Sequence, residues 1–298
     1  MTASPAYGAS PVSARKRSTG VELSALDDAI VNAVRAEHPV SLRGVYYRVV
    51  SAGAVEKTEA AYKQVGRRLL ALRRSHQVPY AWVTDGTRLR YKPDSWDNVE
   101  QMLADASASY RRALWNDQKA DVIIMCEKDA ITGVVYPVTR EWDVELCITR
   151  GYSSETFTHA VSRTVFANHV SGKHTFLYQL GDHDPSGQDA WRSFEQRVRG
   201  FVPTARASFE RLAVTPAQIT GMGLPLRPTK GSDSRTATWD DGGSGGSVEV
   251  DAIPPTVLRG LVRRAIEQHI DVEQWRLSKV AEDSERAVLE ALVRGGTS

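Results

Sequence analysis

The sequence predicts an α/β protein built from two parts. Helical periodicity dominates the first third of the chain, which ends in a hairpin signal. After residue 120, apolar runs of strand length alternate with helical segments, which is typical of a parallel sheet with helices on both faces. A chain of 298 residues is long enough for two domains. We expect a disordered tail over 1–20, a first domain over 21–118 and a second over 119–298.

The composition is that of a globular protein, with 41% hydrophobic and 25% charged residues. No apolar run approaches the ~18 residues of a membrane helix, and residues 1–20 lack the apolar stretch of a signal peptide. We therefore expect a cytoplasmic protein with no membrane partner. The two cysteines, Cys126 and Cys147, lie in apolar runs and are expected to be buried free thiols.

The charges are distributed unevenly along the chain. Residues 1–120 carry 18 Lys and Arg against 12 Asp and Glu, whereas residues 121–298 carry 20 against 24. A basic first part indicates contact with a polyanion, and an acidic second part indicates a site that holds cations.

Three helices are predicted in the first domain from apolar stripes and capping residues. They begin near Ser24, Ser41 and Thr58. Two strand-like runs, 80–84 and 87–91, then flank an Asp-Gly pair, which predicts a two-residue hairpin. Three helices followed by a hairpin is the order of a winged helix-turn-helix.

Basic residues are concentrated on and around the third predicted helix. Between residues 43 and 74 there are eight basic and two acidic side chains, more than a solvated helix face usually carries. We expect this helix to contact double-stranded DNA, although a solvated face is the alternative. The residues predicted to contact DNA are Lys63, Arg67, Arg68, Arg73, Arg74 and Arg88.

The second domain is predicted to follow a connecting helix over 94–118. Its strands are expected near 121–126, 144–149, 174–181 and 208–214. A flexible loop over 230–247 and a helix from Pro254 onward complete the chain.

Three carboxylates follow two of these predicted strands. Glu127 ends the first strand, and Asp182 and Asp184 end the third. Because carboxyl ends of parallel strands share one edge of a sheet, these residues are candidate ligands for one or two Mg²⁺ ions, with Mn²⁺ as a substitute. An EF-hand calcium loop is excluded, because its twelfth position is Ser193 rather than a carboxylate. A solvated Asp-rich turn is the alternative for the aspartates alone.

Four sequence features occur in an order that suggests a known family. Glu127 with the D-x-D-x-x-G run at 182–187 resembles a Toprim domain. The run LRGVYY at 42–47 is similar to a catalytic-tyrosine motif, and VEVDAIPP at 248–255 to the segment before the carboxyl-terminal helices. Together with GDHDPSG at 181–187, these features resemble the A subunit of type IIB topoisomerase (topoisomerase VI) and the related meiotic double-strand-break transesterase. The resemblance extends from about residue 25 to 275.

The resemblance implies a winged helix-turn-helix (CAP-like) domain followed by a Rossmann-like Toprim domain. It implies Mg²⁺-dependent cleavage of DNA by transesterification, with formation of a 5′-phosphotyrosyl link. It also implies a homodimer in which the tyrosine of one protomer faces the Toprim site of the other. No segment resembles the ATPase of the family's B subunit, so a separate ATPase is a possible partner.

The choice of nucleophile also follows from helical geometry. On a helix that begins near Ser41, Tyr46 falls on the buried stripe, whereas Tyr47 lies one step round, four residues after Arg43. The family places its nucleophile at the second tyrosine of such a pair. We therefore expect Tyr47 to attack the phosphate, with Arg43 and Glu127 as the other catalytic residues.

Two other functions are compatible with the same sequence features. A Toprim nuclease could hydrolyse DNA with metal-activated water and leave Tyr47 structural. Alternatively, the protein could bind DNA without cleaving it. A nucleoid-associated location is expected in each case.

Overall fold

The structure, a computed structural model, describes residues 20–84, 93–227, 239, 243 and 246–295. Most of the predicted tail and of the predicted 230–247 loop, as well as the second hairpin strand with Arg88, lie outside the described residues. Both cysteines are buried free thiols, as predicted. No helix in the described part of the chain has the length and apolar character needed to cross a membrane.

The first part of the chain contains the three predicted helices. They are α1 (Gly20–Glu37), α2 (Leu42–Ser51) and α3 (Glu59–Arg74). The hydroxyl of Ser41 caps α2 by accepting a hydrogen bond from the Gly44 N–H at 3.0 Å. Thr58 caps α3 in the same way, through the Ala61 N–H at 3.1 Å. The capping residues therefore fix the starts of α2 and α3 as the sequence predicted.

The strand predicted over 80–84 is mostly wrong. Residues Tyr80–Trp82 form a 3₁₀ turn, and only β2 (Val83–Thr84) is extended. The strand β2 pairs in parallel with β1 (Val40–Ser41), with Val40 opposite Val83. The sequence signal was local, whereas β1, the partner of β2, comes before both α2 and α3 in the chain.

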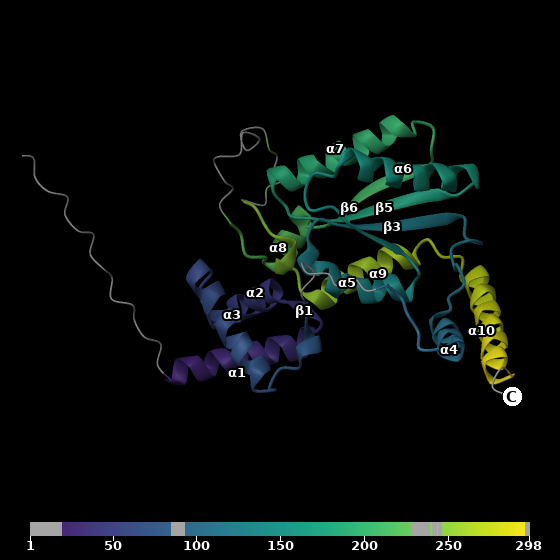
Figure 1. Cartoon of the computed structure of the whole chain (residues 1–298). Helices are drawn as coiled ribbons and strands as arrows, with labels where there is room; N and C mark the ends of the chain where they lie inside the picture. Colours follow the sequence, from purple (N-terminus) through teal and green to yellow (C-terminus); the bar gives the residue numbers. More distant parts are fainter. Residues whose placement is uncertain (1–19, 85–92, 228–238, 240–242, 244–245, 296–298) are drawn as a thin grey trace, which may run out of the picture.

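The second part is built around the predicted four-stranded parallel sheet. Its strands are β3 (Ala120–Cys126), β4 (Glu145–Ile148), β5 (His174–Leu180) and β6 (Ala207–Ala213), in the order β4-β3-β5-β6. Figure 1 shows α6 (Glu155–Val170) and α7 (Pro185–Phe201) on one face of the sheet. The helices α5 (Asp129–Glu141) and α9 (Pro255–Glu267) cover the other face, and α8 (Pro216–Met222) follows β6. The α/β class with parallel strands is confirmed.

Side chains of β3 alternate between the two faces of the sheet. Ile123 and Met125 pack under α6 and α7, whereas Val122, Ile124 and Cys126 belong to the core that α5 and α9 cover. That second core continues without a break into the core of α1, α2 and α3. The boundary predicted near residue 118 therefore does not separate two independent cores.

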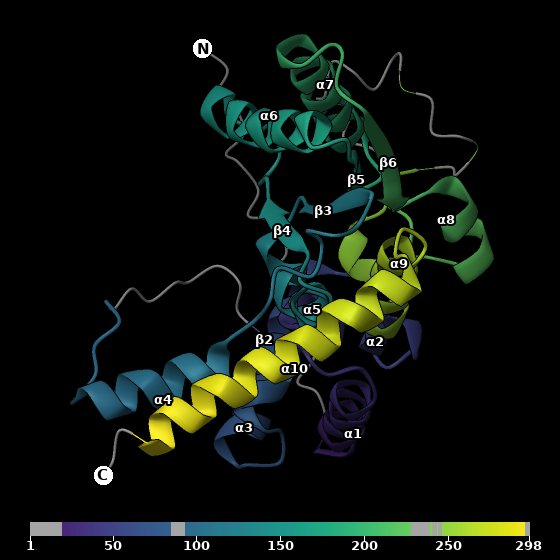
Figure 2. The ribbon, with the colours of Figure 1, turned by 90° about the vertical axis from the view of Figure 1, so that its right-hand side faces the viewer.

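The connecting helix predicted over 94–118 is shorter than expected. It is α4 (Val99–Ser109), which lies beside α10 (Val272–Gly295) (Figure 2). Beyond α4 the chain is held against α10 by side chains, because Tyr110 Oη donates to Glu285 at 2.6 Å. Arg112 Nη1 contacts the same carboxylate at 2.6 Å. These contacts replace the helical hydrogen bonds that the sequence pattern suggested.

Candidate active site

Glu127, Asp182 and Asp184 follow adjacent strands of the sheet, as predicted. Glu127 comes directly after β3, and the two aspartates come after β5, which pairs with β3. Glu127 Oε2 accepts a hydrogen bond from the Asp182 N–H at 3.0 Å. The carboxylate of Glu127 therefore lies against the turn that carries both aspartates.

Two glycines make room for the carboxylates. A Cβ atom at Gly181 would lie 2.7 Å from Glu127 Oε2, closer than carbon and oxygen can approach. A Cβ atom at Gly187 would lie 3.0 Å from Glu127 Oε2 and 3.2 Å from Asp184 Oδ1. Oxygens of Glu127 and Asp184 thus converge on a space that only glycine leaves open.

At this edge of the sheet, burial and mutual repulsion disfavour the simultaneous ionisation of Glu127, Asp182 and Asp184. Burial, reinforced by the charges of Asp182 and Asp184, raises the pKa of Glu127 to about 7. Burial also raises the pKa of Asp182, although Lys128 opposes the effect. A bound cation would relieve this cost, so the electrostatics suit a cation site.

The aspartates also have structural partners. Asp184 is the N-cap of α7, and its Oδ1 accepts from the Gly187 N–H at 2.7 Å and from Ser186 Oγ at 2.9 Å. Asp182 Oδ1 accepts from the Val250 N–H at 2.9 Å. Among the described residues, no three His, Cys, Asp or Glu side chains are grouped in a way that could hold a metal ion. The Mg²⁺ site therefore stays a prediction that requires rearrangement of these carboxylates.

Lys128 is the central cation of the site, and the sequence did not indicate its role. Its Nζ lies 2.8 Å from Asp182 Oδ2. It also lies 3.4 Å from Glu249 Oε2 and 3.4 Å from Asp251 Oδ2. Glu249 and Asp251 flank the start of a 3₁₀ turn, η3 (Val250–Ala252), inside the segment that resembled a family motif. That resemblance was the only signal for these two residues.

Glu249 joins the first part of the chain to the sheet. Arg43 Nη1 lies 2.6 Å from Glu249 Oε2, and Arg227 pairs with the other carboxylate oxygen. Burial alone would raise the pKa of Glu249, but Lys128, Arg43 and Arg227 together hold it below its ordinary value. Glu249 is therefore an ionised group between three cations.

Tyr47 is buried, contrary to the expectation that it lies off the core side of α2. Its side chain is 1% exposed, and its phenol interacts electrostatically with the Glu249 carboxylate. Burial, followed by the charge of Glu249, raises the pKa of the phenol. The helix is covered on two sides, because α1 and α3 pack on one and η3 on the other. Tyr46 is buried as predicted, and its Oη donates to the Thr58 carbonyl at 3.1 Å.

The residues predicted to contact DNA have different surroundings. Lys63, Arg67 and Arg74 are exposed on α3. Arg68 Nε donates to Asp27 Oδ1 at 2.7 Å and so ties α3 to α1. The Arg73 guanidinium lies over the Tyr80 ring, 4.4 Å from its centroid. Of the described basic residues on α3, Arg68 thus has the clearest structural role.

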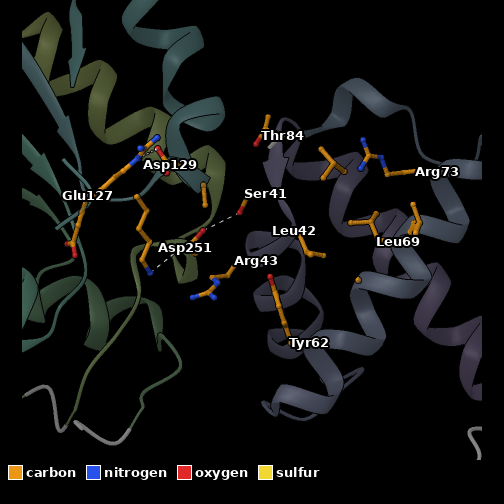
Figure 3. A pocket seen from close by; sticks show the side chains of 16 residues that line it. Ser41, Leu42, Arg43, Tyr62, Leu69, Arg73, Thr84, Glu127, Asp129 and Asp251 are labelled. Carbon is orange, nitrogen blue, oxygen red and sulfur yellow. Dashed lines mark hydrogen bonds and ion pairs between the residues drawn. The ribbon is translucent and has the colours of Figure 1, made fainter. Parts of the chain in front are cut away.

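Two cavities lie where the first part of the chain meets the sheet. The larger, about 730 Å³, is bounded by α2, α3 and β2 on one side and by the residues after β3 on the other (Figure 3). The smaller, about 270 Å³, is lined by Tyr46 and Tyr47 together with Lys57 and Arg227. Arg43 and Tyr62 line both. Tyr47 thus borders a space although its side chain is almost fully covered.

Comparison with known proteins assigns no family to the chain. No family model matches the sequence, and no curated protein matches it significantly.

Proposed function

We propose that the protein cleaves DNA strands in a Mg²⁺-dependent reaction, with the Tyr47 phenol as nucleophile. One observation carries the proposal. The charge of Glu249 acts on the Tyr47 phenol, and Lys128 joins Glu249 to Asp182 through ion pairs at 3.4 and 2.8 Å within one protomer. A candidate nucleophile and a candidate cation site are therefore coupled through two side chains.

These residues have distinct roles in the proposed reaction. Glu249 is the carboxylate that interacts with the phenol, and we assign it the role of taking the phenol's proton. Arg43 turns from Glu249 to the scissile phosphate, where its guanidinium stabilises the added negative charge. The phenolate oxygen then bonds to phosphorus, and the 3′ oxygen of the preceding nucleotide leaves as a hydroxyl after protonation. The product is a 5′-phosphotyrosyl link.

Glu127, Asp182 and Asp184 are the residues that would hold Mg²⁺, or Mn²⁺ in its place. The fit rests on the space that Gly187 leaves beside Glu127 and Asp184, and on the raised pKa of Glu127. The ion supplies charge neutralisation at the phosphate when it is bound.

Hydrolysis by a metal-activated water is the second candidate, and the burial of Tyr47 favours it. A phenol that is 1% exposed with a raised pKa is a poor nucleophile until α2 moves relative to η3. In this alternative Tyr47 only stabilises the contact between the two parts of the chain.

The partners follow from the same proposal. The exposed Lys63, Arg67 and Arg74 on α3 are placed to contact the backbone of double-stranded DNA. Double-strand cleavage requires a homodimer, and strand passage requires a separate ATPase of the B type. The contacts on which the proposal rests join Tyr47 to the carboxylates of its own protomer, so we propose that each protomer of the dimer cuts one strand with its own Tyr47.

Incubation with supercoiled plasmid tests the proposal. The reaction contains Mg²⁺, Mn²⁺ or EDTA and is stopped with detergent, and the DNA is analysed with and without protease on a denaturing gel. Transesterification gives nicked or linear DNA whose migration changes on protease treatment. Free ends that are insensitive to protease and unchanged in Tyr47→Phe indicate hydrolysis. Salt-sensitive binding without cleavage in either metal contradicts both enzymatic functions.

A further inference from the structure

The larger cavity has two chemically different walls. Figure 3 shows the wall from α2, α3 and β2 facing the wall that carries Glu127, Asp129 and Asp251. The proposed cleavage reaction places the scissile phosphate at Arg43 and Mg²⁺ at Glu127, but it assigns no ligand to the part of the cavity beside α3 and β2. The two walls together indicate what that ligand is.

The wall on the first part of the chain is mainly apolar. Leu42, Leu69, Leu70 and Val83 line it, with the ring of Tyr62 at one side. Leu70 is 42% exposed. An apolar wall with one aromatic ring is suited to the face of a nucleobase.

On the opposite wall, the carboxylates of Asp129 and Asp251 each lie beside a cation. Asp129 is held by Arg150, whose Nε lies 3.0 Å away. Asp251 accepts from Ser41 Oγ at 3.2 Å and lies 3.4 Å from Lys128 Nζ. Asp129 and Asp251 are therefore each paired with a cation. Glu127 on the same wall keeps its proton below its pKa of about 7, so in solution more acidic than that the wall carries little unpaired negative charge.

Two buried donors that belong to this cavity lack acceptors. Arg73 Nε and Thr84 Oγ1 are buried without a hydrogen-bond partner among the described residues. Buried donors are usually paired, so each carries a cost that a ligand with acceptor oxygens would remove. A phosphate group has such oxygens, and Arg and Thr are common phosphate ligands.

The size of the cavity limits the ligand to one nucleotide. A space of 730 Å³ corresponds to a cube with an edge of about 9 Å. The major groove of B-DNA alone is ~12 Å wide, so a duplex cannot enter. The volume falls in the range of ~300–1,000 Å³ that is typical of small-ligand pockets.

We propose that this cavity binds one unpaired nucleotide, with its base on the apolar wall and its phosphate on Arg73 and Thr84. The nucleotide comes either from a free nucleoside monophosphate or from an unpaired position in a DNA strand. The binding needs neither Mg²⁺ nor Tyr47, so it can be measured without cleavage. Its failure would leave the proposed cleavage reaction standing, and the reverse also holds.

Isothermal titration calorimetry of the full chain in EDTA tests this binding. The probes are deoxyadenosine monophosphate, inorganic phosphate, a single-stranded deoxyadenosine octamer and the duplex of that octamer. The blocking variant is Gly66→Leu on α3, because a Cβ at Gly66 meets only Leu42 carbons, at 3.6 Å and beyond, and the longer side chain then fills the cavity. Gly200→Leu on α7, where nothing lies within 4 Å of a Cβ, is the matched control.

We expect the monophosphate or the octamer to bind, and Gly66→Leu to weaken the affinity about tenfold or more while Gly200→Leu leaves it unchanged. Thr84→Val, which keeps the side-chain shape, should weaken binding several-fold without loss of stability. Tighter binding of the octamer identifies a strand as the source, and tighter binding of the monophosphate identifies a free nucleotide. Equal affinity for phosphate and monophosphate, equal affinity of the two leucine variants, preference for the duplex, or no saturable binding would each overturn the proposal.

Discussion

Replacement of Glu127 by glutamine tests the electrostatics of the carboxylate edge. The glutamine oxygen can still accept the hydrogen bond from the Asp182 N–H, so the change removes mainly the charge. In the folded protein the Glu127 carboxyl titrates at about 7, against 4.5 for an unperturbed glutamate. Each unit of difference between the folded and unfolded pKa corresponds to about 1.4 kcal/mol in the free energy of unfolding, which gives ~3 kcal/mol in total.

The sign of the effect follows from proton binding. Between pH 4.5 and about 7 the folded protein retains a proton on Glu127 that the unfolded chain has lost. The free energy of unfolding of the wild type therefore falls as the pH rises through this window, and the loss is complete above it. The variant has no such group, so it should match the wild type near pH 4.5 and exceed its stability by up to ~3 kcal/mol at pH 8.

Urea unfolding in EDTA at pH 4.5, 6, 7 and 8 measures this difference, with both proteins followed by circular dichroism. Addition of Mg²⁺ at pH 8 should stabilise the wild type and leave the variant unchanged, because the ion binds the ionised carboxylate. An advantage of the variant that is the same at every pH would refute the reasoning. A wild type that is more stable than the variant at pH 8 without metal would refute it as well.

Three further predictions concern Gly187, Lys128 and two arginines of α3, and their effects on stability are measured by the same urea unfolding. Gly187→Ala should cost ~1–3 kcal/mol, because its Cβ would lie 2.8 Å from the Asp182 carbonyl, whereas Gly200→Ala in the same helix should stabilise by up to ~1 kcal/mol. Lys128→Met should cost ~3–5 kcal/mol, because three carboxylates lose their shared cation, and a cost below ~1 kcal/mol would contradict its central role. Arg68→Ala should lower stability by about 1 kcal/mol through loss of its ion pair on α1, and Arg67→Ala should leave stability unchanged but weaken DNA binding and reduce its salt dependence. If filter binding showed weaker DNA binding for Arg68→Ala, and urea unfolding showed lower stability for Arg67→Ala, DNA contact through the exposed face of α3 would be contradicted.

The sequence predicted the sheet well because its signals are local. Each strand is a short apolar run between helical segments, and the carboxyl ends of parallel strands necessarily share an edge. The proximity of Glu127 to Asp182 follows from that rule and is confirmed at 3.0 Å. The caps of α2 and α3 were predictable for the same reason, because Ser41 and Thr58 act only on the next turn of chain.

The features that sequence reasoning missed depend on contacts between distant segments. Lys128 gains two of its three carboxylate partners only because residues 249–251 return to the sheet after more than 120 residues. Tyr47 is buried because η3 covers a face of α2 that the helical periodicity assigned to solvent. Similarly, β2 pairs with β1, which comes before α2 and α3 in the chain. No local pattern encodes these three contacts.

The central claim is that Tyr47 becomes joined to DNA, and label transfer tests it most directly. A double-stranded oligonucleotide with internal radioactive phosphates is incubated with the protein and Mg²⁺, digested with nuclease, and the protein is separated under denaturing conditions. Wild type and Tyr46→Phe should carry label, which peptide mapping should locate in the segment that contains Tyr47. Tyr47→Phe should carry none. Label that persists in Tyr47→Phe, or cleavage of DNA by the wild type without any labelled protein, would contradict the account.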